Sequence, residues 1–171
     1  MKVKSLFILS GLLLLWLQMT YAQDPGPTPS DYADLLSTEI RGLSPEKIEE
    51  YRTGKGMGLA LPAELNGYPG PRHVLDLAGE LALSEEQEQQ IQALYDQMLP
   101  EAIRIGEEIL AGEAALELAY REKTIDEESL YDQLVALGQL QAELRYAHLS
   151  THLATIEILT PHQIMQSRPP A

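Results

Sequence analysis

The chain has 171 residues but no cysteine, and only one tryptophan and one phenylalanine. Without cysteine it can form no disulfide, no cysteine-ligated zinc or iron–sulfur site and no thiol nucleophile. Basic residues are also few, with 12 Lys and Arg against 26 Asp and Glu, for a formal charge of −14. This charge argues against nucleic acid as a partner, because phosphate binding needs clustered basic side chains. Apolar residues make up 44%, which is enough for one packed core.

Residues 1–22 have the layout of a secretory signal peptide. Lys2 and Lys4 precede an apolar run over 6–17, and Ala22 is a small residue suited to cleavage. The run is shorter than the roughly 20 apolar residues of a membrane span, and the alternative interpretation is an uncleaved N-terminal anchor. We expect a periplasmic protein cleaved after about Ala22. Cleavage removes two lysines and no acidic residue, so the mature chain has 10 basic against 26 acidic residues, a net charge of −16.

The mature chain is expected to form one helical domain over residues 31–167, preceded by a proline-rich leader (23–30) and followed by a short tail (168–171). Its first part should contain short helices, each of the first two followed by a glycine in the position of a left-handed C-terminal cap. A segment with five glycines and three prolines follows, where a regular helix or strand is not expected. The expected helices are 31–41, 45–53 and 71 to about 81, and the Gly/Pro-rich segment is 54–71.

Two long helices are predicted over 84–122 and about 125–158, because apolar residues recur there at alternating spacings of three and four. The short break at Lys123–Thr124 predicts that they fold back as an antiparallel hairpin. The small residues Ala102, Gly106 and Gly112 would let a partner helix approach closely. The predicted apolar stripes are Ile91, Tyr95, Met98, Ala102, Ile105, Ile109, Gly112, Leu116 and Ala119 in the first helix, and Leu130, Leu134, Leu137, Gln141, Leu144, His148, Thr151, Thr155 and Ile158 in the second.

No segment alternates apolar and polar residues over the length of a strand, so the fold class is predicted to be all-α. The hairpin cannot bury both sides of its stripes alone. The short N-terminal helices, a second chain, or both are expected to cover the rest.

Helix-capping sequences occur at two informative places, Leu83-Ser84-Glu85-Glu86-Gln87 and Leu159-Thr160-Pro161-His162-Gln163. In each, Ser or Thr caps the helix and Gln three residues later can bond back to the capping residue. A looser third copy is Leu43-Ser44-Pro45-Glu46-Lys47. The second box predicts a short C-terminal helix.

This arrangement over residues 71–167 resembles the Leu-Thr-x-x-Gln proteins of the bacterial envelope, the Spy/CpxP family with its metal-responsive relatives ZraP and CnrX. Ser84 replaces the usual Thr in the first motif. The resemblance implies a bent helical-hairpin protomer, a cradle-like homodimer and a non-enzymatic role in envelope stress. Spy-type members are ATP-independent chaperones with a basic, apolar concave face, whereas the basic residues of this chain are scattered and outnumbered.

His148 and His152 lie four residues apart, so both rings project from one face of the second long helix. This is ligand spacing for Zn(II), Ni(II), Co(II) or Cu(II), and the pair continues the apolar stripe rather than the polar face. Two imidazoles there need hydrogen-bond partners or a metal. The alternative interpretation is therefore a pair of half-buried groups bonded to a carboxylate or a carbonyl.

A third ligand for such a metal could come from the Gly/Pro-rich segment or just after it, from His73, Glu64, Asp76 or Met57. The resemblance to CnrX-like proteins favours His73, because their site lies between the N-terminal portion and this part of the last helix. His162 is expected at the surface, and Met98 is interpreted as core packing.

Enzymatic motifs are missing: Leu149 stands where a zinc peptidase has its glutamate, and the glycines near Lys55 lack the spacing of a phosphate loop. We therefore expect a non-enzymatic protein without an organic cofactor. The favoured hypothesis is a periplasmic envelope-stress protein that binds or senses divalent transition metals. The alternative is a chaperone for unfolded clients, or an adaptor of a membrane-bound sensor or anti-sigma protein.

Overall fold

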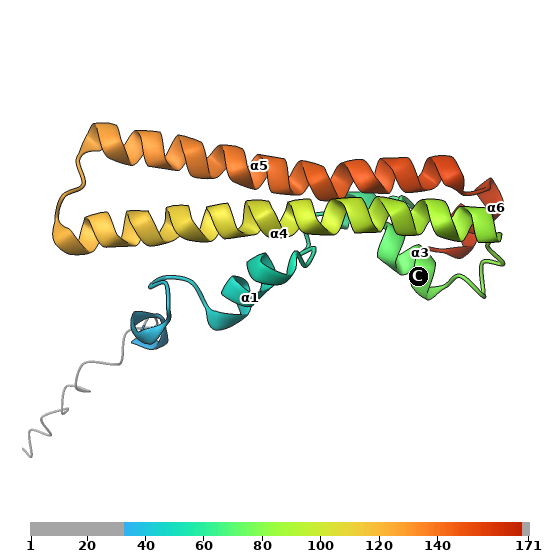
Figure 1. Ribbon diagram of the computed structural model, residues 1–171, viewed down its shortest axis with the longest axis horizontal. Coiled ribbons are helices and arrows are strands. Elements are labelled where there is room, and N and C mark those ends of the chain that lie inside the picture. The colour runs from blue at the N-terminus through green and yellow to red at the C-terminus, as the bar shows by residue number, and fades with distance from the viewer. Residues whose placement is uncertain (1–32, 169–171) are drawn as a thin grey trace, which may run out of the picture. The chain divides into compact units, whose positions relative to one another are not determined.

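The computed structural model describes residues 33–168, and these residues belong to one compact unit that is entirely helical (Figure 1). No strand occurs among them, which confirms the predicted all-α class. The predicted signal segment (1–22), the leader (23–30) and the last residues of the tail lie outside the described residues. The elements are a 3₁₀-helix η1 (Ala33–Ser37), then α1 (Pro45–Thr53), α2 (Leu61–Glu64), α3 (Pro71–Asp76), α4 (Glu85–Glu122), α5 (Glu127–Ile158) and α6 (Pro161–Gln166).

The two long helices α4 and α5 form the predicted antiparallel hairpin and lie side by side (Figure 1). The reversal depends on two local features. Lys123 takes a left-handed conformation (φ 57°) that ends α4, and Asp126 caps α5 by accepting a hydrogen bond from the Ser129 backbone N–H. Helix α4 is continuous through Pro100. Helices α3 and α6 lie at the open end of the hairpin (Figure 1).

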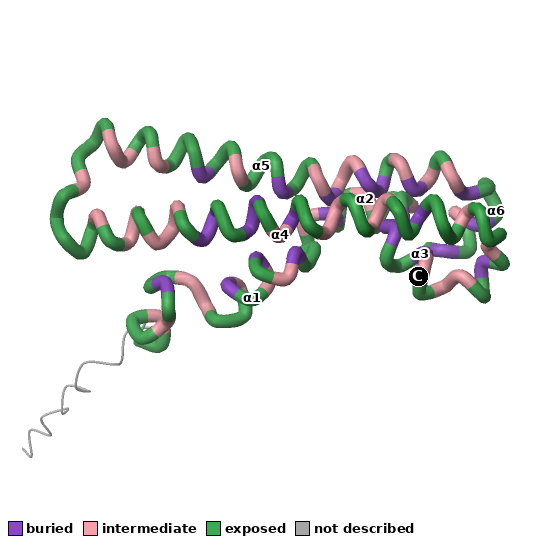
Figure 2. The backbone as a smooth tube through the Cα atoms, in the orientation of Figure 1, coloured by how far each residue is buried: buried purple, intermediate pink, exposed green. Residues whose placement is uncertain are grey.

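Burial along the hairpin follows the inner faces of both helices (Figure 2). Leu137 and Leu144 of α5 are buried there with Ile105 and Ile109 of α4, as the stripes predict. Leu134, however, is 51% exposed, so its predicted place in the core is wrong. In a straight α-helix, residues seven apart drift by about 20° per heptad around the helix axis. A seven-residue stripe therefore turns gradually away from the partner helix, and residues near one of its ends become exposed.

Helix α1 packs on α4, and both of its ends match the prediction. Ser44 accepts a hydrogen bond from the Lys47 backbone N–H, and Gly54 ends the helix in a left-handed conformation (φ 62°). Gly106 of α4 faces α1 so closely that a Cβ there would overlap the carbonyl oxygen of Tyr51. The predicted close approach at Gly106 is therefore confirmed, and α1 is the partner helix.

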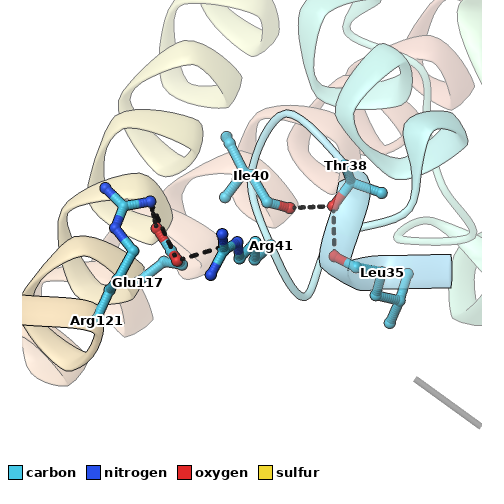
Figure 3. A network of polar contacts seen from close by, with 6 residues as sticks. All are labelled: Leu35, Thr38, Ile40, Arg41, Glu117 and Arg121. Carbon is cyan, nitrogen blue, oxygen red and sulfur yellow. Dashed lines mark hydrogen bonds and ion pairs between the residues drawn. The ribbon is translucent and has the colours of Figure 1, made fainter. Parts of the chain in front are cut away.

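The N-terminal segment differs from the predicted helix over 31–41, because within its described part only η1 forms. The Thr38 hydroxyl lies 2.9 Å from the carbonyl oxygen of Leu35 and 2.7 Å from that of Ile40, so the side chain replaces continued helical bonding (Figure 3). Just beyond, Arg41 forms an ion pair with Glu117 of α4, which ties this segment to the hairpin (Figure 3).

Two other boundaries also differ from the sequence-based expectation. The helix starting at Pro71 ends at Asp76 instead of about residue 81, and Ala82 then takes a left-handed conformation (φ 48°) before α4 begins. The Gly/Pro-rich segment contains the single-turn helix α2, although no regular helix was expected there. Pro62 occupies the first turn of α2, where its missing N–H costs no helical hydrogen bond.

The two capping boxes pack against each other at the open end of the hairpin. The Gln87 side chain accepts from the Ser84 backbone N–H (3.1 Å) and donates to the carbonyl oxygen of Ile158 (2.9 Å). Gln163 makes the matching bonds, accepting from the Thr160 N–H and donating to the carbonyl of Leu81. The two side-chain amides also bond to each other at 3.0 and 3.1 Å. Each glutamine thus caps its own helix and holds the other motif.

Replacing either glutamine by alanine should lower the free energy of unfolding by about 1–2 kcal/mol, because buried amide and carbonyl groups lose their partners. The Gln87→Ala/Gln163→Ala double variant should lose less than the two single losses added together, because both remove the same amide pair. Urea unfolding of the four proteins measures this coupling, with Gln90→Ala at an exposed position of α4 as the control. Strictly additive losses would show that the two motifs do not act as a pair.

Candidate metal centre

His148 and His152 lie on the flank of α5 that faces the Gly/Pro-rich segment, and each is only 5% exposed. Their spacing of one helical turn places the two imidazoles on one side of the helix, as expected. The segment over 54–70 crosses from α4 to α5 next to them. Gly54 contacts Leu99 of α4, and Gly70 contacts His152 of α5.

The His152 ring is oriented by the backbone. Its Nδ1–H donates to the carbonyl oxygen of Tyr68 at 2.7 Å, which fixes the tautomer and leaves Nε2 with its lone pair. Gly70 lies against the other side of the ring, where a Cβ would come within 2.8 Å of Nε2. A histidine that donates one N–H to a carbonyl and presents the other nitrogen is the usual arrangement of a metal ligand.

His148 has no such partner. Its Nε2 is buried and makes no hydrogen bond within the described residues; Gln133 Oε1, about four turns away on α5, is the other such side-chain atom there. An unpartnered buried polar group costs about 1–3 kcal/mol, so it calls for a specific explanation. Burial lowers the pKa of His148 below its ordinary value, and neighbouring His152 lowers it further. The imidazole is therefore neutral near pH 7, the form that binds a metal.

All three histidines predicted as ligands, His73, His148 and His152, line one cavity of about 440 Å³ between α5, α4 and the Gly/Pro-rich segment. His73 lies on α3 and is exposed, and its Nε2–H donates to the carbonyl oxygen of Ser167 at 2.9 Å. Its ring is thus held by the C-terminal segment. No three His, Cys, Asp or Glu side chains of the described residues are close enough together to form a metal-binding group.

The other candidate third ligands differ in whether they line this cavity. Glu64 and Met57 line the same cavity, whereas Asp76 is not part of its wall and pairs with Arg72 at 3.0 Å. His162 is exposed in the first turn of α6, as predicted. Met98 packs against the hydrophobic core, as its position in the apolar stripe predicts, and it also lines the cavity wall, which the stripe alone does not show.

Gly70→Ala should weaken metal binding about 10–100-fold, because the new methyl group displaces the His152 ring from the Tyr68 carbonyl. The backbone at Gly70 (φ −80°, ψ 159°) suits alanine, so the fold should be retained. Gly56→Ala is the matched control in the same segment, where a Cβ meets nothing within 4 Å. Calorimetric titration of the three proteins measures the effect. Equal affinities would show that the His152 orientation is unimportant for binding.

The pH dependence of stability should carry the signature of His148. Its pKa in the folded state lies below the value of about 6.5 of an unfolded histidine, so the unfolded chain takes up the proton first as the pH falls. The free energy of unfolding should therefore decrease from about pH 6.5 down to the folded-state pKa, and be unaffected by this group above pH 7. Calorimetric melting between pH 5 and 8 should show a smaller decrease in His148→Leu. Identical profiles would contradict the buried neutral imidazole.

Comparison of the chain with protein-family models, with curated proteins and with solved structures found no match. Within residues 33–168, no helix has the length and apolar character needed to cross a membrane.

Proposed function

We propose that the protein is a non-enzymatic periplasmic protein that binds or senses transition-metal ions through His148 and His152. The observation that carries this proposal is the buried, unpartnered Nε2 of His148 beside a second imidazole already oriented by a backbone carbonyl. A metal ion entering from the cavity that His148 lines would give this nitrogen the partner that it lacks among the described residues. The acidity of the chain, with a formal charge of −14, adds a long-range attraction for cations.

Metal binding at this place would connect parts of the chain that are far apart in sequence. His148 and His152 belong to α5, whereas His73, Glu64 and Met57 belong to α3 and the Gly/Pro-rich segment. An ion held between them would fix that segment against the hairpin. A sensor needs such a difference between its metal-free and metal-bound states, because its partner must distinguish the two. The ion shifts the equilibrium between these states only if it binds one of them more tightly.

The direct test is calorimetric titration of the purified, chelator-treated protein with Zn(II), Ni(II), Co(II) and Cu ions. The proposal predicts one ion per chain with micromolar or tighter affinity, and release below pH 5 as the imidazoles are protonated. Absence of binding for every ion, or several weak sites that remain at low pH, would point to surface carboxylates and refute the proposal.

A second candidate function, a chaperone for unfolded polypeptides, is favoured by the outer face of α5. Apolar residues recur along the exposed side of this helix, and four that share one helical face are more than half exposed. We call these residues the outer stripe: Tyr131 (69%), Val135 (52%), Tyr146 (73%) and Leu153 (57%). Because the chain is acidic, the occupant that fits best is an extended client with apolar and basic side chains.

The chaperone candidate predicts that metal-free protein suppresses aggregation of a basic client such as chemically reduced lysozyme. Tyr146→Ser/Leu153→Ser should reduce that suppression, whereas Gln139→Ser, also exposed on α5, should not. Light scattering of the protein alone gives its mass in the same experiment. If the double variant only dissociates a homodimer and suppression is unchanged, the outer stripe is a self-association surface and the chaperone candidate is wrong.

A further inference from the structure

Two methionines lie in the wall of the cavity that the histidines line, and they come from different parts of the chain. Met57 belongs to the Gly/Pro-rich segment and Met98 to α4, and both are half-buried. The cavity wall therefore offers thioether sulfur as well as imidazole nitrogen. This donor set bears on which ion the site takes.

Met98 lies at the level of the histidine pair. The register of the hairpin is shown by Gly112 of α4, which faces the Leu137 side chain of α5. Met98 lies two heptads before Gly112 on α4, and Thr151 lies two heptads after Leu137 on α5. In an antiparallel hairpin the same register therefore places Met98 opposite Thr151. Thr151 lies between His148 and His152 in the sequence, so Met98 is at the level of the two histidines along the hairpin, and it lines the same cavity.

Met57 has an unusual backbone for its position. It takes a left-handed conformation (φ 48°) between two glycines, Gly56 and Gly58, either of which would adopt it more easily. Non-glycine residues in this region cost about 1 kcal/mol or more and are often found at functional sites. Met57 lines the cavity and also packs against the hydrophobic core, at a position where a glycine would offer no donor.

Carboxylates are scarce on this wall, and its other side-chain oxygen donors are the hydroxyls of Thr53 and Tyr95. Glu64 is its one carboxylate, and that residue is exposed, while the His73 imidazole is held by the Ser167 carbonyl. The imidazole nitrogen and thioether sulfur donors of this wall outside His73 are thus the side chains of His148, His152, Met57 and Met98. Thioether ligands favour soft ions, of which Cu(I) is the physiological example, whereas Zn(II), Ni(II) and Co(II) are served by nitrogen and oxygen ligands.

We propose that the site takes copper as Cu(I), bound by His148 and His152 together with the thioethers of Met57 and Met98. This inference rests on the proposed metal-binding function and specifies the ion, which is monovalent copper and not one of the divalent metals expected from the sequence. A Cu(I) ion is satisfied by few, soft ligands, so the site needs neither His73 nor a carboxylate.

The test compares Cu(I) and Zn(II) affinity in the purified protein under anaerobic conditions, with a chromogenic Cu(I) chelator as competitor. Met57→Leu/Met98→Leu conserves volume and apolarity, so folding should be retained and is checked by melting. We expect Cu(I) affinity to fall at least 100-fold and Zn(II) affinity to change less than threefold. Met165→Leu is the matched control, because Met165 is 62% exposed on α6.

X-ray absorption at the copper edge provides a second readout that does not depend on the variants. The chain has no cysteine, so any sulfur bound to copper comes from methionine. A sulfur shell that disappears in the double methionine variant supports the proposal. A nitrogen-only shell, or Cu(I) affinity that the methionine substitutions leave unchanged, overturns it while leaving metal binding by the histidines intact. If neither ion binds, or if binding survives loss of both histidines, the proposed function itself is wrong.

Discussion

Replacing His148 by leucine is expected to weaken metal binding strongly and, at the same time, to stabilise the metal-free protein. Binding should weaken at least 100-fold, because one of two imidazole ligands is lost. The free energy of unfolding should rise by about 1–2 kcal/mol, because a buried nitrogen without a partner is replaced by an apolar group of similar size. A gain in stability with a loss of function is the expected behaviour of a binding residue in an unfavourable environment.

His152→Leu and His162→Leu complete this experiment. His152 donates to the Tyr68 carbonyl, so its replacement should weaken binding and also lower stability. His162 is exposed, so its replacement should change neither. The measurements are metal titration and denaturant unfolding of all four proteins. If His148→Leu lowers stability as His152→Leu does, or if it retains full affinity, His148 is a structural residue.

Gly106→Ala is expected to lower the free energy of unfolding by about 2–3 kcal/mol, although alanine is intrinsically the better helix former. The new Cβ would overlap the carbonyl oxygen of Tyr51, and backbone cannot move aside as a side chain can. Helix α1 must therefore separate from α4 and expose Ile48 and part of their shared core.

The matched control is Gly138→Ala, in the interior of α5, where a Cβ meets nothing within 4 Å. This variant should be about 0.5–1 kcal/mol more stable than the natural chain, since only the backbone entropy of glycine is removed. Thermal and urea unfolding of both variants give the comparison. Equal effects in the two variants would show that α1 does not pack on Gly106 in solution.

The sequence predicts the fold best where local and tertiary signals agree. Ser84, Asp126 and Thr160 cap helices through short-range hydrogen bonds, and two of these caps were recognised from the sequence alone. The failures have tertiary or side-chain causes. The helix predicted from Pro71 is shortened by the turn that leads into α4, and Thr38 bonds to nearby carbonyls instead of continuing a helix.

The candidate site is visible in the sequence only in part. The spacing of His148 and His152 places both on one helix face, but it does not show that one ring bonds to the Tyr68 carbonyl while the buried Nε2 of the other has no hydrogen-bond partner within the described residues. Equally, the bond from His73 to the Ser167 carbonyl joins residues 94 positions apart. Such long-range pairings depend on how α3 and α6 pack at the open end of the hairpin, which no local pattern specifies.

A metal ion shared by His148 and His152 would be detected by ¹⁵N NMR of the imidazole nitrogens during titration with a diamagnetic ion, Zn(II) or Cu(I). We expect one equivalent of metal to shift a ring nitrogen of His148 and one of His152, while the nitrogens of exposed His162 stay unchanged. Unchanged His148 and His152 signals at saturating metal, or a shift of His162 before them, would contradict this expectation.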